Sequence, residues 1–284
     1  MAFYVIKGSF HVVGYSPDGD SVKFMADDPS KWSLLEGSSV ALNGNGHAQL
    51  RLESIDSLET HYQGEHQPLT LAFKAMKFLL KELTITNVQL NANRTRVVSA
   101  NDGKRGYIIS RAVERNHRPI SFVYSGEPDV PDWTPVFLDV NRLKQSLNYK
   151  SIVAGMSYPT YYEGFFSDLR EAMNQAAAQA RAAGLGIWAR DRTNTGFDVP
   201  NLAKIEDTHV ILPKLFRRLA SFLDGGGVVA GFKDYLDSLN EDVAIVGSPN
   251  FPGTHFTHFD TLIEIVGNVV RLTEKPEHLI FGEG

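Results

Sequence analysis

The chain has 284 residues, 43% of them hydrophobic and 21% charged, and this length suits one domain with an extension or two small domains. No apolar run reaches the roughly 18 residues of a membrane helix, and the absence of cysteine excludes disulfides and thiolate metal sites. Because the N-terminus lacks a recognisable secretory signal, we expect a cytoplasmic protein.

Charge is distributed unevenly along the chain. Residues 1–190 carry 20 Lys and Arg against 19 Asp and Glu, a net charge of +1, whereas residues 191–284 carry 8 against 14, a net charge of -6. The segment 94–118 holds seven basic residues and two acidic ones. Such a basic arm can attract nucleic-acid phosphates, and the alternative is a solvated hairpin face.

The first two-thirds of the chain predict a β-rich domain with packed helices. Strand patterns with turn residues between them occur at 21–24, 49–52, 86–90, 107–113 and 120–124. Helical patterns occur at 68–83, 143–147 and 168–183, the last of them followed by Gly184 as a C-cap. Strands in this order with a helix between them suit a small closed barrel.

The pattern changes at about residue 195. Amphipathic helices are predicted at 213–223 and 232–239, and the segment 261–274 predicts a hairpin that turns at Gly267–Asn268. We therefore expect a domain at 1–190 followed by a small acidic α+β extension at 195–284. We hypothesise that this extension mediates self-association or shields the basic arm.

Three acidic positions have the order that a cation site for phosphodiester hydrolysis needs. Asp20 ends an Asp-Gly-Asp turn, and Asp56 and Glu59 lie in the run R-L-E-S-I-D-S-L-E. Asp20 and Asp56, with the carbonyl oxygen of Ser57, could bind Ca²⁺ or another divalent cation. Glu59 could orient the attacking water or accept its proton.

Two arginines complete this pattern. Arg51 opens the same run, and Arg118 opens the strand R-P-I-S-F-V-Y. Their guanidinium groups could hold the phosphate and neutralise the charge that develops on it.

The order and inner spacing of these motifs resemble the staphylococcal nuclease (thermonuclease) family over about residues 8–190. The resemblance rests on D-G-D-S-V-K-F, R-L-x-x-I-D-x-x-E, A-F-K-A-M-K-F-L-L, R-P-I-S-F-V-Y and the closing A-A-Q-A-R-A-A-G-L-G-I-W. It implies a five-stranded OB-fold barrel and a Ca²⁺-dependent nuclease that cleaves DNA, RNA or both by in-line attack of water. It also implies Asp20, Asp56 and Ser57 as metal ligands and catalytic roles for Arg51, Glu59 and Arg118.

The sequence departs from the family pattern at several positions. Leu58 replaces the usual proline before the glutamate, and Asn116 replaces a tyrosine that commonly precedes the second arginine. Arg105 is a rival for the role of Arg118. Insertions at about 26–48 and 125–138 enlarge the loops near the barrel mouth. The alternative to a nuclease is therefore a non-catalytic OB-fold module that binds nucleic acid or protein.

Further candidate contacts to nucleic acid are four basic residues and one aromatic residue: Lys104, Arg105, Arg111, Arg115 and Tyr158. For Tyr158 the alternative to base stacking is packing beneath the last helix. The run H-F-T-H-F-D could bind a transition metal through His255, His258 and Asp260. Strand alternation would separate His255 from the other two, so structural histidines are the preferred interpretation.

Overall fold

The structure is a computed structural model that describes residues 2–282; residues 1, 283 and 284, at the ends of the two predicted segments, lie outside the described residues. The expected combination of β-strands and packed helices is confirmed, in a structure that is mixed α+β. The chain divides into two compact units, unit 1 (Met1–Glu53 and Lys74–Ser151) and unit 2 (Ser54–Phe73 and Ile152–Gly284). Among the described residues, no helix is both long and apolar enough to cross a membrane.

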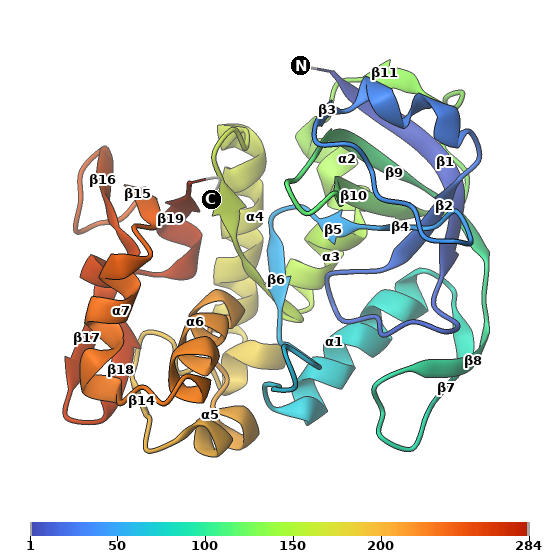
Figure 1. The fold of residues 1–284 in the computed structure, drawn as a ribbon. Coiled ribbons are helices and arrows are strands. Elements are labelled where there is room, and N and C mark those ends of the chain that lie inside the picture. The colour runs from blue at the N-terminus through green and yellow to red at the C-terminus, as the bar shows by residue number, and fades with distance from the viewer. Residues whose placement is uncertain (1, 283–284) are drawn as a thin grey trace. The chain divides into compact units, whose positions relative to one another are not determined.

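Unit 1 is built on a curved sheet with the strand order β4-β2-β1-β9-β10-β5 (Figure 1). Its strands are β1 (Phe3–His11), β2 (Lys23–Ala26), β4 (Ala48–Gln49), β5 (Arg51–Leu52), β9 (Lys104–Val113) and β10 (Pro119–Ser125), with β3 (Glu36–Gly37) on β9 and β11 (Thr134–Val136) on β1. Only the buried Leu50 separates β4 from β5, which are the two ends of this order. One short segment therefore joins both edges, and the sheet nearly closes into a barrel.

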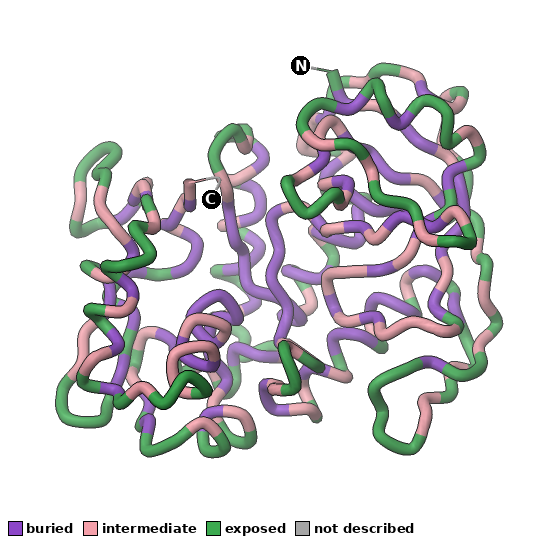
Figure 2. Tube along the Cα trace, viewed as in Figure 1, coloured by how far each residue is buried: buried purple, intermediate pink, exposed green. Residues whose placement is uncertain are grey.

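Most residues of β1 and half of the residues of β9 are buried, and the others are mainly intermediate in exposure (Figure 2). Gly8 and Gly106 face each other in the β1–β9 ladder. A Cβ atom on Gly8 would lie 2.2 Å from the carbonyl oxygen of Met25, and one on Gly106 would lie 2.4 Å from the Phe10 ring. Glycine is therefore required at this crossing, because aromatic rings of the core cover it.

The remaining elements of this part of the chain are helices and one hairpin. They are the 3₁₀ helix η1 (Pro29–Leu34), the hairpin of β7 (Thr86–Leu90) and β8 (Val97–Asn101), and the helices α1 (Leu69–Glu82), α2 (Val140–Gln145) and α3 (Leu147–Val153). The short helix predicted at 143–147 is two helices that break at Ser146. The β7–β8 hairpin is mostly exposed.

Unit 2 contains three small sheets and several helices. The first sheet pairs β6 (Ile55–Ser57) with β12 (Ser157–Pro159). The second has the strand order β13 (Tyr161–Tyr162), β19 (Leu279–Phe281), β15 (Asp242–Val246) and β16 (Thr254–His258). The third has the order β14 (Phe197–Asp198), β18 (Val269–Leu272) and β17 (Ile263–Val266). The helices are α4 (Ser167–Ala182), α5 (Leu202–Thr208), α6 (Pro213–Asp224) and α7 (Phe232–Ser238), with 3₁₀ turns η2 (Gly186–Ala189), η3 (Val229–Gly231), η4 (Phe259–Leu262) and η5 (Pro276–His278).

Several predicted elements of unit 2 agree with the structure within two residues. Helices α4, α6 and α7 occupy the predicted ranges, and Gly184 has a φ of +61°, the left-handed conformation expected after a helix. The hairpin β17–β18 turns at Gly267–Asn268, with Val266 opposite Val269. The residues predicted to form the extension thus share unit 2 with α4 and with β6.

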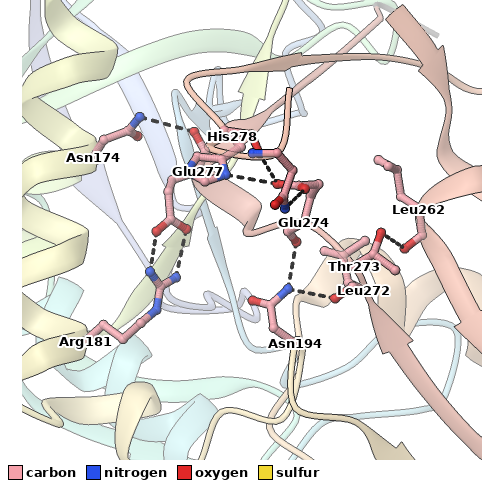
Figure 3. Close-up of polar contacts among 11 residues, drawn as sticks. Asn174, Arg181, Asn194, Leu262, Leu272, Thr273, Glu274, Glu277 and His278 are labelled. Atoms are coloured by element: carbon pink, nitrogen blue, oxygen red, sulfur yellow. Dashed lines mark hydrogen bonds and ion pairs between the residues drawn. The ribbon is translucent and has the colours of Figure 1, made fainter. Parts of the chain in front are cut away.

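A buried polar network ties the C-terminal strand region to α4 (Figure 3). Arg181 on α4 donates paired hydrogen bonds to the carboxylate of Glu277 and lies over the ring of Trp188. The backbone carbonyl of Glu277 also accepts a hydrogen bond from Asn174 at 3.2 Å. Because Glu277 is only 5% exposed, its charge depends on Arg181 for compensation.

Candidate functional site

Unit 1 brings Asp20, Arg51 and Arg118 onto neighbouring segments. The amide of Leu52 donates to the carbonyl of Asp20 at 3.0 Å, which places the Asp-Gly-Asp turn beside β5. Arg51 pairs with Ile120 in the parallel β5–β10 ladder, and Arg118 lies just before β10. Three residues predicted for one site therefore lie on adjacent backbone segments where the sheet nearly closes.

The two arginines share a single carboxylate. Glu114 accepts a hydrogen bond from Arg51 Nη1 at 2.9 Å and another from Arg118 Nε. Burial raises the pKa of Glu114, but the hydrogen bonds and charges of Arg118 and Arg51 outweigh burial and lower it. The side chain of Glu114 is 9% exposed, whereas those of Arg51 and Arg118 are 28% and 35% exposed. We call these three residues the arginine group; their summed charge is +1.

Unit 2 holds the other predicted residues, Asp56, Ser57 and Glu59. Asp56 and Ser57 belong to β6 and are buried opposite Tyr158 and Ser157 of β12. The following loop is fixed by Gln67, which accepts a hydrogen bond from the Glu59 amide through its side chain and donates its own amide to the Glu59 carbonyl. Leu58 is fully buried. Burial of Leu58 thus fixes the loop at the position where the family pattern has a proline.

Arg217 of α6 bridges the two acidic side chains of unit 2. Its Nη1 donates to Asp56 Oδ1 at 3.0 Å and to Glu59 Oε1 at 2.6 Å, and its Nη2 donates to Asp56 Oδ2 at 2.9 Å. Burial disfavours the charged guanidinium, but the carboxylates of Asp56 and Glu59 raise the pKa of Arg217 well above its usual value. These three residues form the carboxylate group, with a summed charge of -1.

The basic residues proposed for nucleic-acid contact differ in their surroundings. Arg105 makes paired hydrogen bonds to Asp27, both at 2.7 Å, and a third to Glu127 at 3.1 Å. Arg111 lies over the Phe3 ring at 5.2 Å. Within residues 2–282 no ion pair involves Lys104 or Arg115. Arg105 is therefore engaged by acidic side chains of its own unit, unlike Lys104 and Arg115.

The proposed base-stacking residue Tyr158 is fully buried. Its hydroxyl donates to Asp191 Oδ1 at 2.7 Å, and its ring packs edge-on against Trp188 at 5.0 Å between centroids. In this arrangement the ring has no face open to a nucleic-acid base. The packing interpretation is therefore the correct one for Tyr158.

An open depression of about 770 Å³ also lies in unit 2, bounded mainly by α7 and the β17–β18 hairpin. Its lining includes Lys233, Asp234 and Glu264, and none of the predicted site residues. The chemistry inferred from the sequence is thus not centred on this depression.

Comparison of the sequence with models of protein families gives no match, and comparison with curated proteins finds no relative. The resemblance to staphylococcal nuclease therefore depends on the motifs and on the surroundings of their residues.

Sequence reasoning missed Glu114 and Arg217, the two residues that neutralise the predicted site residues. Glu114 is four positions from Arg118 and was visible only as one acidic residue within the basic arm. Arg217 is 161 positions from Asp56 and lies on a helix that the sequence predicted from its apolar face. Contacts between residues so far apart leave no local sequence signal.

Proposed function

We propose that this chain is a metal-dependent nuclease built on an OB-fold barrel, which hydrolyses phosphodiester bonds of DNA, RNA or both. The observation that carries the proposal is the convergence of Asp56 and Glu59 on one cationic atom. Arg217 Nη1 lies within 3.0 Å of both carboxylates, so this part of unit 2 is already shaped to surround a positive charge. The arginine group offers the complementary feature, two guanidiniums that converge on one anion.

The donor atoms fit a hard divalent cation such as Ca²⁺, which prefers carboxylate and carbonyl oxygens. Asp56 and the Ser57 carbonyl would hold it, with Asp20 as the third residue implied by the motif. Arg217 has to move away from Asp56 first, because both carboxylate oxygens of Asp56 accept hydrogen bonds from Arg217. When bound, such an ion polarises a phosphoryl oxygen and lowers the pKa of a water molecule.

The roles of the chain's own side chains follow from their charge and surroundings. Glu59 is held by Gln67 and is the base or orienting group for the attacking water. Arg51 and Arg118 bind the phosphate in place of Glu114 and neutralise its developing charge. In this mechanism the side chains of each group act only after release from their own counter-ion, Glu114 or Arg217.

The test is incubation of the full chain with labelled single- and double-stranded DNA and RNA in Ca²⁺, Mg²⁺ or chelator. We expect cleavage that a chelator abolishes and that Glu59→Gln lowers by about 10²–10⁴-fold, the usual contribution of a positioned base. Glu65→Gln, in the same loop, is the matched control and keeps its activity. Cleavage by Glu59→Gln at the wild-type rate would refute the proposed mechanism.

A second candidate is a non-catalytic module that binds nucleic acid or protein. The observation in its favour is that both charge groups are already neutralised, by Arg217 and by Glu114. It predicts a gel shift with labelled nucleic acid, or capture of a protein, without cleavage in any divalent cation. Cleavage that depends on Glu59 would exclude it.

A further inference from the structure

A second group of potential metal ligands lies in unit 2, apart from the residues of the proposed nuclease mechanism. Asp237 on α7, His258 at the end of β16 and Asp260 in η4 each offer one ligand atom, and these atoms lie within 4.8 Å of one another. Strand alternation in the sequence predicts His258 and Asp260 on one face of a strand. In the structure β16 ends at His258, and the turn η4 brings Asp260 back beside it.

The carboxylates of this cluster differ from those of Asp56 and Glu59, which Arg217 compensates. The oxygen Oδ1 of Asp260 is shielded from solvent and accepts no hydrogen bond. Within the described chain, no Lys or Arg forms an ion pair with Asp237 or Asp260. A buried carboxylate oxygen without a partner is unfavourable, so a cation at this position would remove a defect of the folded protein.

The surroundings of the cluster hold its ligands in place. Phe259 and Leu262, on either side of Asp260, are buried, as is Leu236 next to Asp237. Asp242 faces His258 across the β15–β16 ladder, and its Oδ1 lies 3.3 Å from His258 Nε2. Such a carboxylate commonly fixes the tautomer and orientation of a metal-binding imidazole.

We propose that Asp237, His258 and Asp260 form a binding site for one divalent transition metal, with Zn²⁺ as the best candidate. An imidazole nitrogen with two carboxylate oxygens suits Zn²⁺ and its first-row neighbours, whereas Ca²⁺ and Mg²⁺ select oxygen ligands. Asp237 is exposed and Asp260 is the most buried member, so the site opens to solvent on the α7 side. Water can therefore complete the coordination.

The experiment is a calorimetric titration of the full chain, freed of metal with a chelator, with Zn²⁺ and separately with Ca²⁺. We expect saturable binding of one Zn²⁺ per chain, and a rise in Tm with Zn²⁺ concentration because the ion binds only the folded state. Titration with Co²⁺ gives a second readout, since coordination by His258 changes the visible absorption of the ion.

Two variants identify the ligands, and a third controls for them. His258→Ala and Asp260→Asn are each expected to weaken Zn²⁺ binding at least tenfold. His255→Ala is the matched control, because His255 lies on the same strand, stacks on Phe251 and is not a member of the cluster. Circular dichroism shows whether each variant is folded. If His258→Ala does not fold, Asp260→Asn alone tests the site.

Absence of saturable Zn²⁺ binding would overturn the proposal, and so would wild-type affinity in both variants. The second result would assign the ion to other residues, such as Asp56 and Glu59. Failure of this site is distinguishable from failure of the proposed nuclease function, because His258→Ala should leave Ca²⁺-dependent cleavage unchanged.

Discussion

The arginine group and the carboxylate group have the same design with opposite charge. In unit 1 two guanidiniums enclose one carboxylate, and in unit 2 two carboxylates enclose one guanidinium. The enclosing side chains differ in exposure: those of Arg51 and Arg118 are 28% and 35% exposed, whereas those of Asp56 and Glu59 are 7% and 14% exposed. The central side chains differ in the opposite sense, with 9% for Glu114 and 24% for Arg217. A ligand can therefore reach the enclosing side chains of the arginine group more readily than those of the carboxylate group.

The largest effect should follow removal of an arginine that has to bind phosphate. We expect Arg118→Ala to lower cleavage by roughly 10³-fold, as loss of a preorganised donor to a developing negative charge does. Single-turnover cleavage measures it. Arg142→Ala is the control, since Arg142 lies in the same unit and pairs with Asp129. Equal activity of the two variants would contradict the phosphate-binding role of the arginine group.

The next effect concerns Arg217, the half-buried counter-ion of the carboxylate group. In chelator, Arg217→Met should lower the free energy of unfolding by about 3–5 kcal/mol, because it removes the guanidinium that bridges Asp56 and Glu59. Added Ca²⁺ should restore stability, since Asp56 is then free to bind it. Urea unfolding with and without Ca²⁺ measures both. Arg218→Met, at the neighbouring position, should show no response to Ca²⁺, because Lys214 still pairs with its partner Glu241.

A smaller effect, dependent on pH, is expected for Glu114. Its lowered pKa means that its ion pairs stabilise the fold above the unfolded-state value of about 4.3, and that this contribution is lost as pH falls through the folded-state pKa. Glu114→Gln should cost about 1–2 kcal/mol at pH 7 and should flatten the loss of stability in acid. Urea unfolding between pH 7 and pH 2 tests this, with the exposed Glu36→Gln as control. An unchanged acid limb would show that Glu114 does not contribute.

The smallest effect is expected at Arg105, the sequence rival of Arg118. Its ion pairs with Asp27 and Glu127 are well exposed, so Arg105→Gln should change stability by less than about 1 kcal/mol. Its effect on cleavage should remain far below that of Arg118→Ala. If the two effects were reversed, the phosphate-binding role would pass to Arg105.

Local patterns in the sequence predicted the helices and several turns, because periodicity and capping residues act within a few positions. Helices α1, α4 and α6 and the turn at Gly267–Asn268 are examples. Strand β1 was not predicted: its residues are buried on both faces, so alternation is missing, and Gly8 lies within it.

The charged motifs identified which residues gather, but not their counter-ions. Asp20, Arg51 and Arg118 do lie on neighbouring segments, as do Asp56 and Glu59. Arg217 could not be foreseen, since its partners come from a distant part of the chain. Deletion of residues 195–284 would test whether the extension shields the basic arm, but it would also remove Arg217 and buried residues such as Phe216. The point variant Arg217→Met is therefore the cleaner experiment.

The link between Arg181 and Glu277 has a practical consequence for anyone trimming or tagging the protein. Digestion from the C-terminus that stops before it reaches Glu277 keeps the ion pair, whereas a stop codon just before Glu277 leaves the half-buried Arg181 on α4 without this partner. We expect such a truncated protein to be obtained in low yield and to aggregate. Purification tags and fusion partners should therefore be added after Phe281, so that strand β19 stays intact.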